Sequence, residues 1–181
     1  MELRSQDIVL VLKLLANNSP AWSFSKLGKE LGMSTSHAFE SALRAQTANL
    51  LTISTAPPSP PRGRGVLFEP RRGNVLEFLV HGVKYSFPVE RAGVTRGIPT
   101  AEGAPPLSEY FGVASMPPVW PHPEGSVRGI SFSPLYKNVP QAALRDPKLY
   151  ELLALVDAIR EGRAREREIA IRELTARIDS P

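Results

Sequence analysis

A glycine between two short helix-forming segments constrains this chain more than any other feature of its sequence. Before Gly32, Leu27 and Leu31 lie four residues apart and so share one face of a helix, which Ser25 is placed to cap. Glycine adopts the left-handed backbone that ends a helix at little cost. The sequence therefore predicts a helix that stops at Gly32 and a tight turn after it.

A second helix is predicted directly after the turn, over the segment STSHAFESALRAQTA. Ser34 is the expected N-cap, and Asn49 is the expected left-handed residue at the other end. The inward stripe of this helix consists of small residues, namely Ala38, Ala42 and Ala45. Two short helices joined by a four-residue turn around a glycine form a helix-turn-helix.

The segments on either side extend this motif. Asp7 is placed to cap a helix that carries apolar residues at helical spacing and ends before Pro20. Trp22 and Phe24 alternate as in a very short strand. After the second helix of the motif, LLTIST and GVLFEP alternate as strands on either side of the proline-rich, basic loop APPSPPRGR. Two strands and a basic loop in this place form a wing, so residues 1–70 are predicted to be a winged helix-turn-helix DNA-binding domain.

The remaining chain, residues 71–181, is predicted to be an interaction or dimerisation region. It opens with a helix over RRGNVLEFLVHGV and a strand over Val83–Val89. Residues 99–140 hold nine prolines together with several aromatic residues, which favours an ordered loop. Helices are predicted over residues 147–178, with Asp146 as the first cap. The expected fold class is therefore α+β, mainly α.

The apolar stripe of the first C-terminal helix must be buried, because leucine side chains are unfavourable in water. Packing within the chain, a dimer seam and a partner-binding face would each account for it. Gly162 is expected to end this helix. The stripe consists of Leu149, Leu152, Leu153, Val156 and Ile159.

Composition narrows the classes of protein. The net charge is +4, and residues 56–100 alone carry seven Lys and Arg against three Asp and Glu, as a local footprint on nucleic acid requires. The chain has no cysteine, which excludes disulfides and thiolate metal sites. No apolar run is long enough to span a membrane, and no secretory signal is present, so a cytoplasmic protein is expected.

The chemistry of DNA recognition falls on the second helix of the motif. A helix fits the major groove, where each base pair shows a distinct edge, and the first turn of the helix meets the bases. Short polar side chains and exposed amides there suit base and phosphate contacts. The predicted contacts are Ser34, Thr35, Ser36 and His37 in the first turn and Glu40, Ser41 and Arg44 on the outward face.

The loop PRGRG supplies the second set of candidate contacts. It is close to the Pro-Arg-Gly-Arg-Pro core of AT-hook peptides, with Gly65 in place of the last proline. Arginines that flank a glycine fit a narrow, A·T-rich minor groove. Arg62 and Arg64 are predicted to touch DNA there, while Arg71 and Arg72 either hold phosphates or cap solvent-exposed turns.

The segment FSKLGKELGMSTSHAFESALRAQTANLLT, together with the wing, resembles the winged helix-turn-helix of bacterial MarR-like regulators. The resemblance implies a dimeric repressor whose second motif helix lies in the major groove and whose wing lies at the minor groove. Two features depart from the family: Glu40 stands where a basic residue is frequent, and Ala42 and Ala45 replace larger aliphatic residues. The part beyond Arg71 does not resemble the dimerisation helices of that family.

Motifs for catalysis are missing from the sequence. The three histidines, His37, His81 and His122, are far apart, and none has a metal-ligand spacing. There is no glycine-rich phosphate-binding loop and no nucleophile elbow. The sequence therefore predicts no enzyme, no cofactor and no metal site.

The expected function is sequence-specific regulation of transcription by a repressor that blocks promoter access as a homodimer on double-stranded DNA. An antitoxin is the alternative: its N-terminal half would repress its own operon, and its C-terminal half would bind a toxin-like enzyme. Extended chain with aromatic anchors in residues 99–140 suits the wrapping of such a partner. A pocket for a small effector would account for the same segment.

Overall fold

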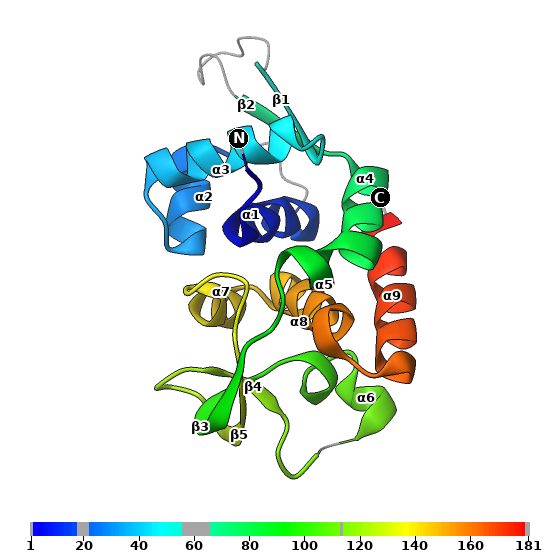
Figure 1. The fold of residues 1–181 in the computed structure, drawn as a ribbon. Coiled ribbons are helices and arrows are strands. Elements are labelled where there is room, and N and C mark those ends of the chain that lie inside the picture. Colours follow the sequence, from blue (N-terminus) through cyan, green and yellow to red (C-terminus); the bar gives the residue numbers. More distant parts are fainter. Residues whose placement is uncertain (1, 18–21, 56–65, 113, 180–181) are drawn as a thin grey trace. The chain divides into compact units, whose positions relative to one another are not determined.

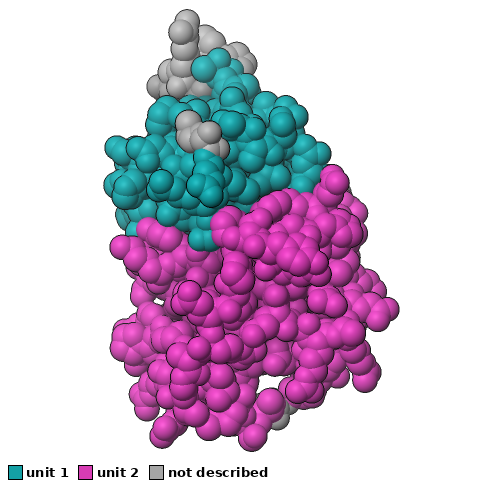
Figure 2. Space-filling model, viewed as in Figure 1, with its two compact units in different colours: residues 1–75 teal, residues 76–181 magenta. Residues whose placement is uncertain are grey.

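The computed structural model describes residues 2–17, 22–55, 66–112 and 114–179 (Figure 1). They form an α+β structure that is mainly helical, as predicted. The chain divides into two compact units, residues 1–75 (unit 1) and residues 76–181 (unit 2), which Figure 2 shows in different colours. Among the described residues, no helix combines the length and the apolar character that crossing a membrane requires.

Most of unit 1 is helical and consists of α1 (Ser5–Ala16), α2 (Phe24–Leu31) and α3 (Thr35–Thr47). Most apolar residues of α1, the two leucines of α2 and the alanine stripe of α3 are buried and form its core, whereas Leu15 at the end of α1 is half-buried. Because alanine side chains are small, α3 packs closely on both α1 and α2.

Gly32 and Ser34 end α2 and begin α3 as predicted, whereas α1 begins at Ser5, with Arg4 and not Asp7 as its N-cap residue. Asp7 accepts a hydrogen bond from the backbone N–H of Arg4 at 2.8 Å, so it caps α1 from inside the first turn. Gly32 ends α2 with a φ of 66°. At the start of α3, the hydroxyl of Ser34 accepts the N–H of His37 at 3.1 Å. These side chains satisfy N–H groups that have no partner within the helix.

Two predictions just before α2 are wrong. Ser23, and not Ser25, caps the helix, since its side chain accepts the N–H of Lys26 at 3.2 Å. Phe24 is the first residue of α2, so the short strand predicted around it does not form. The alternation of the two aromatic rings has another cause. Trp22 is buried and donates its indole N–H to a backbone carbonyl, whereas Phe24 packs against other aromatic rings.

An antiparallel hairpin follows α3 and consists of β1 (Leu51–Thr55) and β2 (Val66–Pro70), which match the two predicted strands. The strands pair residue for residue along their full length. Asn49, between α3 and β1, has a φ of 59°, as predicted for a left-handed residue at this helix end. The predicted wing loop between the strands, residues 56–65, lies outside the described residues.

Three consecutive helical segments come next: α4 (Arg72–Glu77), the π-helix η1 (Phe78–Gly82) and α5 (Val83–Ser86). The division between the two units falls within α4. The strand predicted over Val83–Val89 is wrong, because helix continues through its first half. Leu79 and Val83 are both fully buried and lie four residues apart, and this helical packing outweighs the alternation of apolar residues that follows.

Three short strands of unit 2 form a closed sheet in which every strand pairs with the other two: β3 (Arg91–Pro99), β4 (Pro118–Pro121) and β5 (Val127–Phe132). We call this sheet the three-strand ring. β3 is antiparallel to both other strands, and β4 and β5 are parallel. Glycines allow the close approach. A Cβ at Gly97 would overlap the carbonyl oxygen of Trp120, one at Gly129 would overlap that of Pro117, and one at Gly125 would overlap the backbone of Gly97.

The prediction that residues 99–140 form a loop is wrong, because the segment contains regular secondary structure. The segment holds β4 and β5 and two short helical turns, η2 (Ala101–Gly103) and α6 (Ser108–Phe111). Its aromatic residues are divided: Trp120 and Phe132 are fully buried, whereas Tyr110 is 45% exposed. The strands escape a periodicity search because they are short and rich in proline and glycine.

The chain ends in three helices: α7 (Val139–Arg145), α8 (Pro147–Glu161) and α9 (Ala164–Asp179). Asp146 caps α8 by accepting the N–H of Leu149 at 3.2 Å, and Gly162 follows its last residue, as predicted. α8 packs against α5, α7, α9 and η2 and is the central helix of unit 2 (Figure 1). All five residues of its predicted stripe are at most 4% exposed. Packing within the chain therefore accounts for this stripe, which offers no dimer seam or partner-binding face.

Candidate nucleic-acid interface

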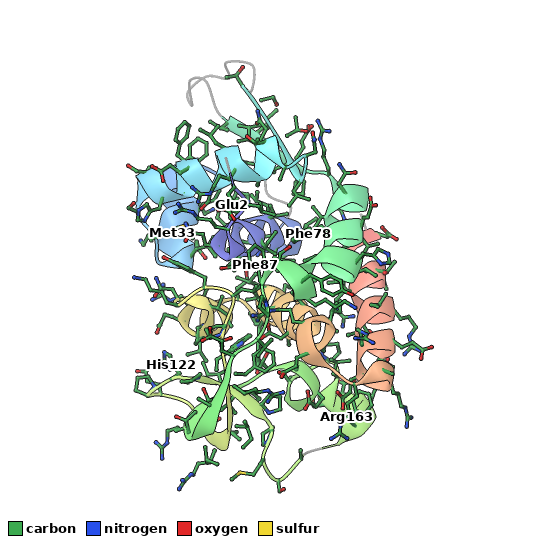
Figure 3. The ribbon with its side chains drawn as sticks, viewed as in Figure 1. Glu2, Met33, Phe78, Phe87, His122 and Arg163 are labelled. Carbon is green, nitrogen blue, oxygen red and sulfur yellow. The ribbon has the colours of Figure 1, made fainter. Side chains whose placement is uncertain are left out.

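The first turn of α3 presents most of the side chains that the sequence predicts for DNA contact. Thr35, Ser36 and His37 are exposed. Ser34 is exposed as well, but its hydroxyl caps the helix, so it has a structural role. Met33 (Figure 3), directly before it, is buried and anchors the turn between the helices in the core. The turn is therefore fixed while the first turn of α3 faces solvent.

The prediction that Ser41 and Arg44 lie on the outward face of α3 is wrong. Ser41 is 0% exposed and Arg44 is 5% exposed. The guanidinium of Arg44 donates to both carboxylate oxygens of Asp7, each at 2.8 Å, and to the hydroxyl of Ser41 at 3.0 Å. Ser41 shares the inner face with the alanine stripe, and Arg44 reaches from the flank of the helix to the buried carboxylate. These contacts turn both side chains away from the solvent-exposed face.

Glu40 lies on the outward face of α3 as predicted, and Phe39 lies there beside it. The side chain of Glu40 is 57% exposed and lies 3.8 Å from the Arg44 guanidinium. Phe39 is 46% exposed and is absent from the predicted contacts. The sequence does hold a signal for it, because Phe39 follows Ala38 and therefore points about 100° around the helix from the buried stripe.

Lysines of unit 1 divide into a buried and an exposed group. Lys13 is 3% exposed, and its ammonium lies 3.0 Å from the carboxylate of Glu30. Lys26 and Lys29 on α2 are both exposed, and the Lys26 ammonium also lies 4.7 Å from the centre of the Trp22 ring. The exposed lysines of α2 thus add positive charge to the surface of the unit.

The predicted phosphate contacts lie at the base of the hairpin. Arg71 is exposed, but its Nε donates to the hydroxyl of Thr52 at 3.1 Å, so this side chain also braces the hairpin. Arg72 is half-buried in the first turn of α4. Arg62 and Arg64, the predicted minor-groove contacts, lie outside the described residues.

The net positive charge of the chain belongs to unit 1. This unit contains nine Lys and Arg against five Asp and Glu, whereas unit 2 contains 13 of each. Two of the five acidic residues, Asp7 and Glu30, are paired with Arg44 and Lys13. Without these two pairs, unit 1 has seven basic and three acidic residues. This excess of positive charge attracts an anionic polymer.

Asp157 of α8 is the centre of a buried hydrogen-bond cluster in unit 2. Its carboxylate accepts from the Thr100 hydroxyl at 2.8 Å, from the Trp120 indole N–H at 2.7 Å and from the Arg160 guanidinium at 2.7 Å. Burial raises the pKa of Asp157, and these donors oppose that shift. Because every one of these partners belongs to the core, the cluster joins the three-strand ring to α8 and has a structural role.

The three histidines lie in separate elements: His37 in α3, His81 in η1 and His122 after β4. His122 (Figure 3) lies with its Nε2 3.2 Å from the side-chain oxygen of Gln141. Within the part of the chain that the structure describes, no group of three His, Asp or Glu side chains is arranged to hold a metal ion.

Comparisons of the whole chain with protein-family models, with curated proteins and with solved structures find no match.

Proposed function

We propose that unit 1 is a winged helix-turn-helix that binds double-stranded DNA, and that the protein is a transcriptional repressor that blocks access to a promoter. The observation that carries the proposal is the exposed polar first turn of α3, on a unit that holds the whole net positive charge. Two further features support it: the order of helices and strands in unit 1, and the resemblance of residues 24–52 to MarR-like regulators.

In this proposal α3 enters the major groove with its N-terminus first. Thr35, Ser36 and His37 meet base edges there, and the N–H groups of the same turn favour phosphate oxygens. Lys26 and Lys29 hold the phosphates beside the groove, since ammonium groups bind the backbone without regard to sequence. Arg62 and Arg64 stay the predicted minor-groove contacts, because arginines that flank a glycine favour narrow, A·T-rich grooves.

A homodimer belongs to the proposal. One recognition helix with one wing buries roughly 600–1,000 Å² on DNA, which is small for a specific complex. Two copies on a two-fold symmetric site double this area and read two half-sites. Unit 2 is the natural place for contacts between the copies, through a surface other than the buried stripe of α8.

The first test is selection of bound fragments from genomic DNA, followed by titration of the preferred duplex at several salt concentrations. Each phosphate contact should contribute about −0.9 to the slope of log K against log salt. We expect a selected duplex to bind far more tightly than a scrambled one. Equal affinity for both duplexes, or an affinity that is independent of salt, would exclude the proposed function.

The second test separates base contacts from phosphate contacts. Thr35→Ala and His37→Ala should change which bases are preferred, with about 1–3 kcal/mol lost for a good direct contact. Lys29→Gln should weaken binding to all duplexes and lower the salt slope by about 1. Arg163→Gln is the matched control, because Arg163 (Figure 3) is an exposed cation of unit 2. If Arg163→Gln weakens binding as much as Lys29→Gln does, the DNA surface has been assigned to the wrong unit.

The antitoxin alternative is less well supported, because two of the aromatic residues behind it are buried. It depends on aromatic anchors in residues 99–140 that could wrap a partner, and Trp120 and Phe132 are fully buried in the core of unit 2. DNA-dependent regulation is therefore the better-supported function.

A further inference from the structure

The outward face of α3 carries two apolar side chains in a place where the proposed function requires contact with bases. Phe39 is 46% exposed, and Leu43, four residues further along the helix, is half-buried. The side chains beside them on this face, those of Ser36 and Glu40, are polar and exposed. The exposed part of the Phe39 ring is therefore available for an apolar contact with a molecule that binds this face.

The ring of Phe39 is held in a defined position. It packs edge-on against Phe24 of α2, with ring centres 5.2 Å apart and planes at 83°. Phe24 packs in the same way against Phe68 of β2, at 5.1 Å and 88°. Edge-to-face pairs of this kind are favourable, and here they link α2, α3 and β2. Phe39 is therefore oriented before any ligand binds, which lowers the cost of using it for recognition.

We infer that Phe39 is a specificity-determining residue that reads the methyl group of a thymine in the major groove. The inference rests on the proposed function, since it requires α3 to lie in that groove. Thymine is the base that presents a methyl group there, and apolar side chains, phenylalanine among them, are its usual partners. The excess positive charge of unit 1 favours a nucleic acid over an apolar protein surface as the molecule that covers this face.

The inference also explains how an acidic residue fits the same face. Glu40 adjoins Phe39, and a carboxylate there repels phosphates but accepts from the amino group of cytosine or adenine. The neighbouring pair thus favours a contact with bases over a contact with the DNA backbone. A thymine methyl is expected against the exposed part of the Phe39 ring, away from its contact with Phe24.

The test uses the full-length protein and the duplex obtained by selection. Each thymine is replaced in turn by uracil, which keeps the base pairing and removes only the methyl group. Wild-type protein should lose about fourfold in affinity at one thymine of each half-site, the effect of one buried methyl group. Phe39→Ala should bind the thymine and uracil duplexes equally, and Phe39→Leu should recover part of the discrimination.

Two controls keep the outcome unambiguous. Tyr85→Ala removes an aromatic residue of unit 2 that is 77% exposed, and it should leave the thymine-to-uracil ratio unchanged. Thermal melting followed by circular dichroism checks that Phe39→Ala is folded, and Phe39→Leu serves if it is not. Specific binding by the wild type with no loss at any uracil would overturn the inference and leave the proposed function standing. An unchanged ratio in folded Phe39→Ala would assign the methyl contact to another residue. Failure of the wild type to prefer any duplex would instead remove the proposed function.

Discussion

Asp7 and Arg44 form a buried ion pair that joins the first turn of α1 to the third turn of α3. Both oxygens of the carboxylate accept from the guanidinium, and one of them also accepts the backbone N–H of Arg4. The free energy of removing both charges from water offsets much of their attraction. The main consequence of the pair is orientation: a bidentate contact fixes the direction of α3, the helix that carries the proposed recognition face.

Removing one member of this pair should be costly. Arg44→Met leaves a buried carboxylate without its cation, and we expect the free energy of unfolding to fall by about 3–5 kcal/mol. The double variant Asp7→Leu, Arg44→Met removes both charges and should recover most of that loss. Urea denaturation followed by circular dichroism measures both. Lys29→Met, at an exposed position, should change stability by less than about 0.5 kcal/mol. A double variant as unstable as Arg44→Met would contradict this account.

Tyr150 provides a test at alkaline pH. Burial raises the pKa of its phenol to about 12, and the hydroxyl donates to the Pro99 carbonyl at 2.6 Å. The pKa in the folded protein lies above the value of about 10 for an unfolded chain. Stability from the neutral phenol is therefore fully present below pH 10 and is lost as the pH rises through 12. In an absorbance titration, we expect one of the four tyrosines to ionise late.

The assignment of that late step is checked with two variants. Tyr150→Phe should abolish it, while Tyr85→Phe, at a side chain that is 77% exposed, should leave it in place. A late step that survives Tyr150→Phe would show that another tyrosine is the protected one.

The three-strand ring depends on glycines that have no room for a side chain. Gly129→Ala would press a methyl group against the Pro117 carbonyl and the Val119 side chain. We expect the free energy of unfolding to fall by about 3 kcal/mol or more, since a backbone atom cannot move aside as a flexible side chain can. Gly93→Ala, in strand β3 of the same ring, is the matched control, because nothing lies within 4 Å of the position that its Cβ would take. Denaturant unfolding should find Gly93→Ala as stable as wild type, and equal losses in both variants would refute the steric explanation.

The sequence predicts those elements whose signals are local. α1, α3 and α8 follow from apolar spacing, and the caps at Ser34 and Asp146 follow from residue type. The ring formed by β3, β4 and β5 is different, because β3 pairs with strands that lie far along the chain and no local pattern encodes that pairing. Prolines and glycines further weaken the signal of these strands.

The candidate site follows the same division. Thr35, Ser36 and His37 are exposed as predicted, because the first turn of a capped helix has a known direction. The predicted outward direction of the Arg44 side chain is wrong, because a long side chain follows its partner, and this partner, Asp7, lies in another helix. Phe39 is not among the predicted contacts, because that prediction considered only polar side chains.

Because the α8 stripe is buried within the chain, a substitution there should lower the stability of the protein without changing its oligomeric state. Leu153 is 1% exposed, so Leu153→Ala should lower the free energy of unfolding by about 2–5 kcal/mol. The proposed dimer uses another surface, so the variant should keep the oligomeric state of the wild type as long as it is folded. Sedimentation velocity should give twice the 19.8 kDa mass of the chain for both proteins. A monomeric wild type would contradict the homodimer. A folded, monomeric Leu153→Ala beside a dimeric wild type would show that the α8 stripe takes part in the dimer contact.

The glycines in and beside the three-strand ring should also help to recognise relatives of this chain. Core side chains can be exchanged over evolution as long as the total volume is kept. Gly97, Gly125 and Gly129 have no such freedom, because each faces backbone atoms that no neighbouring substitution can remove. We therefore expect homologous chains to keep these three glycines at their spacing even where most residues of unit 2 have been replaced. Divergent homologues would then share a sparse glycine signature that outlasts overall sequence similarity.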